Sequence, residues 1–261
     1  ICHAPERVLP GRILREVVEN DRIIGGLTPT CGLKAADFYR KYVSGKLLVT
    51  DAVTAETAKL VENTFRDVNI AFANEVDLIA DHLGIDAWEV IELANHHPRV
   101  NILNPGPGVG GHCIAVDPWF LVASAPEQTR LTRTAREVND YKPHWVVERV
   151  LRRAERFREP TIACLGLTYK PDVDDIRESP ALEIVRSLQA KVQGRVVVVE
   201  PNLEQHPEFP LEELTSALKA ADIVLVLVGH RHFRQIPAKL LEEKVIFDTC
   251  GVLRESSKVR S

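Results

Sequence analysis

Apolar residues recur at helical spacing over residues 52–83. Every third or fourth position in this stretch is apolar, as is typical of one face of an α-helix. The members of that face are Ala58, Val61, Phe65, Val68, Phe72, Val76, Ile79 and Leu83. The pattern predicts one helix of about 45 Å at ~1.5 Å per residue, a length suited to a spine or a dimer interface. Gly84 is its expected end.

Capping residues and prolines mark further helices. Asp86 with Glu89 three positions later is typical of a helix start, and Pro98 predicts that this helix ends shortly before it. Helical periodicity returns at residues 128–140 and again at 143–157. The middle of the chain, residues 51–142, is therefore predicted to be an all-helical region around the long helix.

Residues 1–50 combine short apolar runs with turn residues. A strand is predicted at 21–26, where it ends in a Gly-Gly turn. An amphipathic helix at 34–43 and a short strand at 46–50 follow it. This segment is predicted to be a strand–helix–strand unit.

After Pro160 the pattern changes to short and almost wholly apolar runs. Strands are predicted at residues 161–168, 195–200, 223–228 and 245–248. Helices are predicted after Ser179, with Pro180 at the first helical position, and at 211–221 and 238–243. Strands that are apolar on both sides need cover on both faces, so residues 160–255 are expected to form a doubly wound parallel sheet in an α/β domain at 143–261.

The composition limits the class of protein. Of the 261 residues, 45% are hydrophobic and 27% are charged, and the formal net charge is -4. This balance argues against nucleic acid or a membrane surface as a partner, and no run approaches the ~18 apolar residues of a membrane helix. The five cysteines form no CxxC pair, which argues against a zinc ribbon or a disulfide framework and favours a reducing, cytoplasmic location.

The loop at residues 101–118 is rich in Gly and Pro and carries His112, Cys113 and Asp117. Its glycines allow a ligand to approach the backbone closely, and their amides suit a phosphate or an oxyanion. From the pattern alone, Cys113 is either an accessible nucleophile or a structural thiol. His112 is expected to be a packing residue, because adjacent side chains in a turn often point apart.

Two more groups of polar residues have a functional and a structural interpretation. Lys59 and Asn63 share one helix face, which is either a solvated stripe or the wall of a cleft. The turn at 166–171 follows the first strand of the sheet but lacks the G-x-G-x-x-G pattern. Lys170 and Arg177 near this turn either bind an anion at the sheet edge or are solvated.

Two histidine pairs raise the question of a metal. His96 and His97 precede Pro98, and His230 and His232 lie in the second half of the chain. Neither pair has the partner spacing of a zinc site, so no metal is expected.

Together these segments resemble the UDP-glucose/UDP-N-acetylmannosamine dehydrogenase family. The resemblance is carried by APERVLPG at 4–11, ENDRIIGG at 19–26, TAETAKLVENTFRDVNIAFANE at 54–75, HHPRVNILNPGPGVGGHCIAVDPWF at 96–120 and GLTYKPDVDDIRESPALEIV at 166–185. It covers nearly the whole chain in order, and the GGHC-I-x-VDP-WF wording is highly specific. Val116 stands where the UDP-glucose branch usually has a lysine, so the loop looks like that of the N-acetylmannosamine branch.

The resemblance implies an NAD-dependent oxidation at C6 of UDP-N-acetyl-D-mannosamine, which yields the uronate for cell-surface polysaccharide synthesis. It assigns Cys113 as the nucleophile whose sulfur holds the substrate covalently, first as a thiohemiacetal and then as a thioester. It assigns acid/base or oxyanion duty to Lys59, water positioning to Asn63 and Asp117, and assistance to Glu6. The residue types suit this chemistry, because a thiolate traps an aldehyde and an ammonium stabilises a thiolate and a developing alkoxide.

The resemblance also implies the binding residues and the partners. The sugar nucleotide would contact the catalytic Lys59 and Asn63 together with Arg7, Val8, Arg66 and Gly110. His97 and Arg99 would reach it from a neighbouring subunit, Tyr169 and Lys170 would hold the uridine diphosphate, and Arg177 would approach NAD. A homodimer is expected through the helix at 52–83, and residues 143–261 would be the UDP-binding domain. Residues 1–50 resemble only the end of the family's amino-terminal Rossmann domain, so the chain is expected to be a fragment.

Three alternatives stay open. The substrate could be UDP-N-acetylglucosamine or UDP-glucose, since the epimer depends on pocket shape. The chain could be an inactive UDP-sugar-binding and dimerisation module, because the glycine fingerprint for NAD is missing. A thiol hydrolase that uses Cys113 and His112 is the third alternative, and it requires a Cys–His hydrogen bond. Cys250 departs from the family, which often has a basic residue in that turn and contacts substrate with it.

Overall fold

A computed structural model describes residues 1–8 and 12–254, so the last three residues of the APERVLPG motif lie outside the described part. The chain divides into two compact units. The first contains Ile1–Phe65 and Asp117–Pro126, and the second contains Arg66–Val116 and the chain from Glu127 onward. Among the described residues, no helix is both long enough and apolar enough to cross a membrane.

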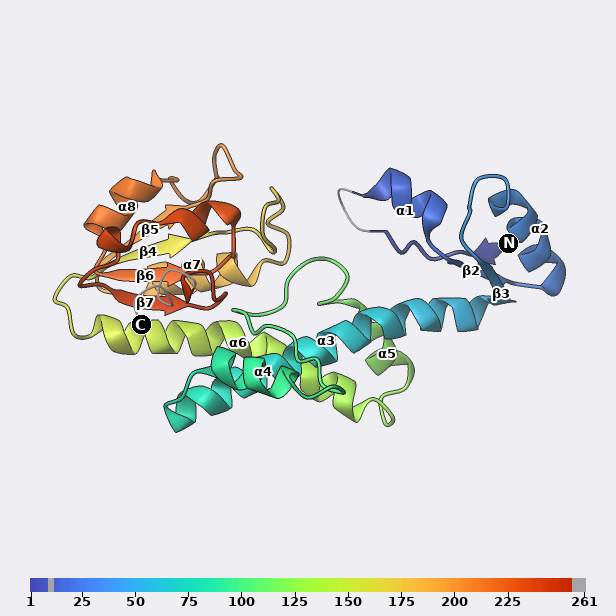
Figure 1. The fold of residues 1–261 in the computed structure, drawn as a ribbon, viewed down its shortest axis with the longest axis horizontal. Coiled ribbons are helices and arrows are strands. Elements are labelled where there is room, and N and C mark those ends of the chain that lie inside the picture. Colours follow the sequence, from blue (N-terminus) through green and yellow to red (C-terminus); the bar gives the residue numbers. More distant parts are fainter. Residues whose placement is uncertain (9–11, 255–261) are drawn as a thin grey trace. The chain divides into compact units, whose positions relative to one another are not determined.

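The first unit contains a small sheet of order β1-β2-β3, in which β2 and β3 are parallel and β1 is antiparallel to β2 (Figure 1). Its elements are β1 (Cys2–His3), α1 (Ile13–Glu19), β2 (Arg22–Gly26), α2 (Pro29–Tyr39), β3 (Leu47–Asp51) and α5 (Asp117–Ser124). The two predicted strands are confirmed to within one residue. Helix α2 begins earlier than predicted because the Thr28 hydroxyl caps it by accepting from the Cys31 amide, and Pro29 fills its first position.

The long predicted helix is confirmed as α3 (Ala52–Leu83), whose 32 residues span about 48 Å at ~1.5 Å per residue. It ends at Gly84, which has a φ of +70°. The next helix, α4 (Ala87–Asn95), starts where the sequence predicts. The Asp86 carboxylate caps it by accepting from the amides of Trp88 and Glu89.

The two helices predicted on either side of Tyr141–Lys142 are wrong, because one helix, α6 (Arg130–Ala154), runs through Pro143. A proline inside a helix removes one backbone hydrogen bond. Here the cost is offset by burial, since Pro143 and Lys142 are both buried and the Lys142 ammonium pairs with Asp77 of α3. Burial still lowers the pKa of Lys142, although Asp77 opposes that shift.

The second unit contains the predicted parallel sheet, in the order β5-β4-β6-β7. The strands are β4 (Thr161–Leu165), β5 (Arg195–Val199), β6 (Ile223–Val226) and β7 (Val245–Asp248). The helices are α7 (Pro180–Lys191) and α8 (Leu214–Ala220), with the 3₁₀ turns η1 (Arg231–Gln235) and η2 (Ala238–Leu240). The helix predicted at 238–243 is thus only a 3₁₀ turn, and η1 and α1 were not predicted.

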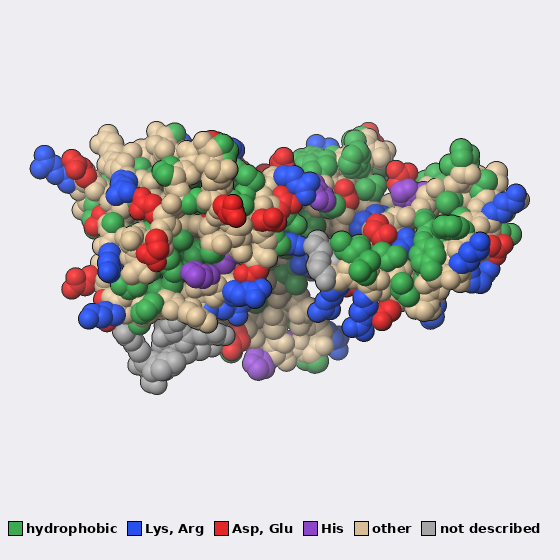
Figure 2. Space-filling view, turned by 90° about the horizontal axis from the view of Figure 1, so that it is seen from above, with side chains coloured by type: hydrophobic (Ala, Val, Ile, Leu, Met, Phe, Trp, Pro, Cys, Tyr) green, Lys and Arg blue, Asp and Glu red, His purple; other side chains and the backbone are tan. Residues whose placement is uncertain are grey.

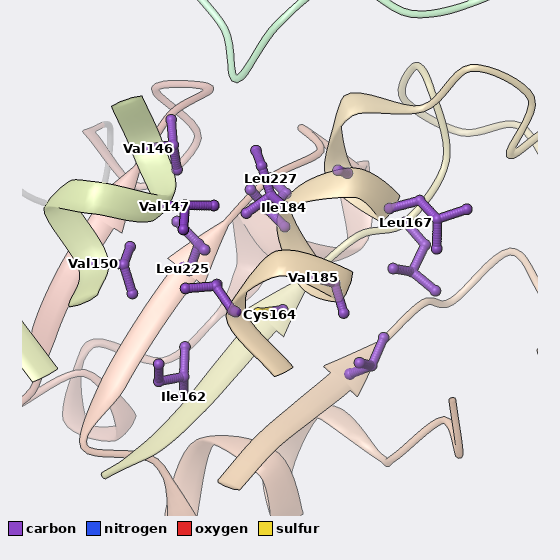
Figure 3. Close-up of a cluster of buried hydrophobic side chains, with 14 of the residues drawn as sticks. Val146, Val147, Val150, Ile162, Cys164, Leu167, Ile184, Val185, Leu225 and Leu227 are labelled. Atoms are coloured by element: carbon purple, nitrogen blue, oxygen red, sulfur yellow. The ribbon is translucent and has the colours of Figure 1, made fainter. Parts of the chain in front are cut away.

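Side chains from alternate positions of the strands form a core on each face of this sheet. On one face Ile162 and Cys164 pack with α6 and α7. Figure 3 shows that face, with Val146, Val147 and Val150 of α6 and Ile184 and Val185 of α7. On the other face Ala163 and Leu165 pack with α8 and with Phe233 of η1. The doubly wound α/β fold predicted for residues 160–255 is therefore confirmed.

Charged side chains cover the surface without segregation by sign. On the face drawn in Figure 2, Lys and Arg side chains are interspersed with Asp and Glu. This agrees with the small formal net charge of -4.

Candidate functional site

The Gly- and Pro-rich loop is anchored to the helices of the second unit by buried amides. The Gly106 amide donates to Asn74 Oδ1 at 2.9 Å, and Asn74 Nδ2 donates to Asn139 Oδ1 at 2.9 Å. Asn139 in turn donates to Asp67, which is fully buried and paired with Arg136 at 2.6 Å. Burial raises the pKa of Asp67 against the opposing charge of Arg136. A polar network inside α3 and α6 thus holds the start of the loop.

Two glycines further along press the loop against the turn that follows β4. A Cβ atom on Gly110 would lie 2.4 Å from the Glu178 carbonyl oxygen, closer than any side chain tolerates. Gly111 has a φ of +86°, and its missing Cβ would meet the ring of Tyr169 at 3.0 Å. Glycine is required at both positions, because only it fits this close backbone approach.

Cys113 lies beside the imidazole of His112. His112 Nδ1 is 3.0 Å from Cys113 Sγ, so the expectation that these adjacent side chains point apart is wrong. Gly111, at φ +86°, lets the chain turn just before the pair. The half-buried thiol therefore has an imidazole nitrogen within hydrogen-bond reach, which accepts its proton in the tautomer with no proton on Nδ1.

A guanidinium fixed near this loop adds positive charge. Arg177 donates to both carboxylate oxygens of Asp175, at 2.9 and 2.6 Å. These bonds lower the pKa of Asp175 to about 2 and raise that of Arg177, to which the charge of Cys113 contributes a smaller part. The electrostatic contribution between Arg177 and Cys113 means that the turn and the thiol loop share one electrostatic environment.

A pocket of about 300 Å³ opens where β4 and β6 end, within the second unit. Its polar or reactive lining residues are Asn104, Thr168, Tyr169, Lys170, Arg234 and Cys250. The volume is at the lower end of small-molecule sites, roughly 300–1,000 Å³. Lys170 and Arg234 give the pocket two cations that suit a phosphate group.

Cys250 lines this pocket without being a candidate nucleophile. Its thiol donates to the Leu227 carbonyl at 3.3 Å, and burial raises its pKa to about 12. Arg234, which the sequence did not single out, supplies a basic group in the pocket where the family pattern would have led us to expect one at position 250.

The sequence prediction also missed a buried polar group beside the pocket, made by Thr168, Glu200 and His230. Each lies within a few residues of the carboxyl end of a buried strand, β4, β5 or β6. The carboxyl ends of parallel strands meet at one edge of a sheet. A polar residue that follows each apolar run was therefore an available signal.

In the first unit, the structure brings together two of the residues assigned to water positioning. Asn63 Nδ2 donates to Asp117 Oδ2 at 2.5 Å, and Asp117 is the first residue of α5. Lys59 lies one turn before Asn63 and makes no ion pair with any residue that the structure describes.

The remaining assigned residues of the first unit are Glu6, Arg7 and Val8. Arg7 pairs with Glu62 of α3 at 2.8 Å, and Glu6 pairs with Arg22 at 3.4 Å. Val8 is half-buried. These contacts fix the segment that precedes residue 9 against β2 and α3.

Of the assigned residues in the described part of the second unit, Tyr169 and Lys170 line its pocket and the others do not. His97 and Arg99 are exposed in the turn after α4, where the Arg99 amide donates to His97 Nδ1 at 3.3 Å. Arg66 is exposed on α3. Their assigned role as contacts from a neighbouring subunit, or to the sugar, stays a prediction.

The fold and the site together define a nucleotide-binding α/β protein with a thiol on a glycine loop. The central-domain model of the UDP-glucose/GDP-mannose dehydrogenase family matches residues 53–141, and the family's UDP-binding-domain model matches residues 163–255. The chain belongs to the UDP-glucose/GDP-mannose dehydrogenase family.

Individual relatives narrow the similarity. The chain is 57% identical to an NDP-N-acetyl-D-galactosaminuronic acid dehydrogenase of Ralstonia solanacearum, over 97% of this chain and 60% of the relative. It is 52% identical to a UDP-N-acetyl-D-mannosamine dehydrogenase of Salmonella typhi, over 97% of this chain and 64% of the relative. A solved structure of the UDP-N-acetyl-mannosamine dehydrogenase from S. aureus matches with a TM-score of 0.86 at 46% identity, over 96% of this chain and 60% of that one. The chain thus spans less than two thirds of the length of these relatives.

Proposed function

We propose that the full-length protein oxidises UDP-N-acetyl-D-mannosamine to UDP-N-acetyl-D-mannosaminuronate, with Cys113 as the covalent nucleophile and NAD as the hydride acceptor. The observation that carries this proposal is the packing of the Cys113 loop against the Tyr169 turn, beside a pocket with two cations. Family membership and the name of the Salmonella relative support the substrate.

The residues of this chain suit the thiol steps of such a reaction. The Cys113 sulfur adds to the carbonyl carbon of the C6 aldehyde, the carbonyl electron pair moves to oxygen, and the thiol proton passes to a base such as His112. Lys59 would stabilise the alkoxide, and Asn63 with Asp117 would hold the water that later cleaves the thioester.

The parallel sheet of the second unit lacks the strand–turn–helix arrangement of an NAD site after its first strand. No helix starts directly after the β4 turn, because α7 begins only at Pro180. The Arg177 guanidinium, which the family resemblance directs toward NAD, is already occupied by Asp175. We therefore propose that residues 1–50 are the end of an NAD-binding domain, followed by a central domain at 51–142 and a UDP-binding domain at 143–261.

The full-length protein tests the proposal directly. NADH formation is measured with NAD⁺ and each of UDP-N-acetylmannosamine, UDP-N-acetylglucosamine and UDP-glucose. Turnover of UDP-glucose alone would end the mannosamine proposal. Cys113→Ser should lower kcat by at least about 10³-fold, whereas the control Cys31→Ser should leave it unchanged.

The 261-residue chain tests the alternative of an inactive binding module. UDP binding without NADH formation supports that alternative for this chain. NADH formation by the chain alone would exclude it.

A thiol hydrolase is a second candidate, because His112 Nδ1 and Cys113 Sγ are within hydrogen-bond distance. His112→Gln replaces the imidazole base by an amide that does not take up the thiol proton, and it should abolish hydrolysis. Hydrolysis of a thioester substrate by the unmodified chain, lost in that variant, would favour the hydrolase. Absence of such hydrolysis removes it.

We also propose that a second copy of the chain covers an apolar surface on α3 and α6. A hollow of about 300 Å³ there is lined mainly by Val68, Ala71, Phe72, Leu131 and Val138. Phe72 and Leu131 are 52% and 68% exposed, which is unusual for large apolar side chains that cluster. Phe72→Glu should convert a dimer to a monomer in sedimentation, and a protein that is monomeric without the substitution refutes this.

A further inference from the structure

His230 lies in a fully buried polar cluster next to the turn that lines the pocket. Its side chain and that of Glu200 are both 0% exposed. His230 Nε2 is 3.1 Å from Glu200 Oε2. No step of the proposed reaction uses either group, so the cluster needs another explanation.

The hydrogen bonds define the tautomer of His230. Nδ1 accepts from the Asp172 amide at 2.9 Å and lies 2.9 Å from the Asn202 side-chain amide. A backbone amide only donates, so Nδ1 has no proton and the imidazole is neutral. Nε2 therefore has the proton and donates to Glu200.

Glu200 completes the cluster as an acceptor. Its Oε2 also accepts from the Leu167 amide at 2.7 Å and from the Thr168 amide at 3.3 Å. Burial opposes ionisation, but the bonds from His230 and the amides outweigh it and keep the pKa of Glu200 below its ordinary value. The carboxylate thus fixes one end of the turn.

His230 fixes the other end of the same turn. Asp172 has a φ of +59°, a left-handed conformation that a non-glycine residue keeps only where its surroundings hold it. The bond from its amide to His230 Nδ1 is such a restraint. Tyr169 and Lys170, which line the pocket, lie between the two anchored ends.

We propose that His230 is a positioning residue for the pocket, whose neutral imidazole fixes the Asp172 amide and thereby sets Tyr169 and Lys170 in the form that receives a nucleoside diphosphate. The inference rests on the proposed function in one respect, the assignment of this pocket to the diphosphate. The inference goes beyond the proposed function because it makes the affinity for the nucleoside diphosphate depend on His230 Nδ1, a buried acceptor that touches no ligand.

Two substitutions separate the two ring nitrogens. His230→Asn places an amide oxygen near the Nδ1 position, so it keeps an acceptor for the Asp172 amide and loses the donor to Glu200. His230→Gln keeps a donor near the Nε2 position and loses the acceptor for Asp172. Leu218→Ala is the matched control, because Leu218 is fully buried in the same domain and packs in the core on the α8 face.

The measurements are UDP affinity of the 261-residue chain by calorimetry, hydrogen exchange of the amides at 168–172, and Tm. We expect His230→Gln to raise the Kd for UDP about tenfold through lost preorganisation and to speed exchange at Asp172. His230→Asn should stay within about threefold of the unsubstituted chain. Leu218→Ala should lower Tm with unchanged Kd.

Each contrary outcome has a distinct meaning. Equal Kd values for His230→Gln and the unsubstituted chain overturn the positioning role and leave the pocket assignment intact. If the loss of UDP affinity is proportional to the loss of Tm in all three variants, His230 is a structural residue and not a positioning residue. An unsubstituted chain that does not bind UDP overturns the pocket assignment, and the positioning role with it.

Discussion

Each of the two described sheets contains parallel strands with apolar sequences, but other elements cover these strands to different extents. In the second unit β6 is buried at all four positions, with a core on each face of the sheet. In the first unit β3 leaves Leu48 and Val49 49% and 44% exposed, although its sequence LLVT is just as apolar at those positions. Strands of a parallel sheet are stable when both faces are covered. The comparison shows that an apolar strand sequence predicts other elements packed on both faces of the sheet. Among the described residues, only the second unit supplies such elements.

The exposed side chains of the first unit extend beyond β3. Leu33 and Phe38 of α2 are 60% and 57% exposed. This fits the proposal that residues 1–50 complete a larger NAD-binding domain in a longer protein. It also predicts that the two units respond very differently to the same perturbation.

The largest difference should appear in thiol alkylation. A hydrogen bond from the Thr28 hydroxyl is the largest cause that lowers the pKa of Cys31 to about 7, whereas burial in β4 raises the pKa of Cys164 to about 12. At pH ~7 the fraction of thiolate is therefore ~10⁵-fold higher for Cys31 than for Cys164. A thiolate with a lower pKa is a weaker nucleophile, which reduces this advantage by ~10²-fold. Iodoacetamide followed by peptide mass spectrometry should show Cys31 reacting at least ~10²-fold faster.

The control for this experiment is Thr28→Ala, which removes the largest cause of the lowered pKa and should slow Cys31 severalfold at neutral pH. Similar alkylation rates for Cys31 and Cys164 would mean that the second unit opens as readily as the first, and the contrast between the sheets would be broken.

The next effect is on stability. Leu225→Ala removes a fully buried side chain from the middle of β6 (Figure 3) and should cost about 3 kcal/mol, as large-to-small core substitutions do. Val49→Ala in β3 should cost less than about 1 kcal/mol, because the side chain is already 44% exposed. Urea unfolding followed by circular dichroism measures both, and a cost for Val49→Ala equal to that for Leu225→Ala contradicts the comparison.

A third test sharpens the comparison by probing where the first unit is tightly packed. A Cβ on Gly25 would lie 2.5 Å from the Ala55 Cβ and 2.6 Å from the Asp51 carbonyl oxygen. Gly25→Ala should therefore destabilise the junction of β2 and α3 by about 2 kcal/mol, as overpacking does. Gly106→Ala, where the nearest atom is 3.9 Å away and φ is not positive, is the control and should cost far less. Thermal unfolding measures both variants. If Gly25→Ala leaves the stability unchanged, the first unit is loosely packed throughout.

The periodic parts of the fold could be predicted from the sequence. Helix α3 and the strands of the parallel sheet follow from spacing and apolar runs, and Ser179 and Asp86 mark helix starts correctly. The break expected at Pro143 is wrong because tertiary burial outweighs the local rule. Helix α1 was missed although Ile13 and Val17 are four residues apart, and none of its residues is buried.

For the candidate site, the sequence predicts individual residues but not the contacts between them. Cys113 and the glycines of its loop stand out in the sequence, and so do Tyr169 and Lys170 once the family resemblance is seen. No local sequence pattern predicts the contacts between segments that are far apart in the chain. The partnership of Glu200 with His230, 30 residues apart, depends on β5 and β6 ending at the same sheet edge. The contact of His112 with Cys113 depends on the turn at Gly111, which no propensity encodes.

The smallest expected effect concerns two carboxylates, exposed Asp51 in the first unit and half-buried Asp175 in the second, whose pKa values are lowered by different partners. Hydrogen bonds from Thr54 lower the pKa of Asp51 in the first unit, and those from Arg177 lower the pKa of Asp175 in the second to about 2. A carboxylate with a lowered pKa contributes its full stabilisation above its unfolded pKa of ~3.9 and loses it as the pH falls through its folded value. The Asp175–Arg177 pair should therefore persist from neutral pH to ~4 and dissociate near pH ~2. Carbon-detected NMR titration should give Asp175 a midpoint near 2 that Arg177→Gln shifts upward, while Asp51 stays unchanged in that variant. Because the Arg177 side chain is 65% exposed, the ion pair is screened by solvent and Tm should barely move. An Asp175 midpoint near ~4 in the unsubstituted chain would mean that Arg177 is not held beside the thiol loop, and is available to another anion.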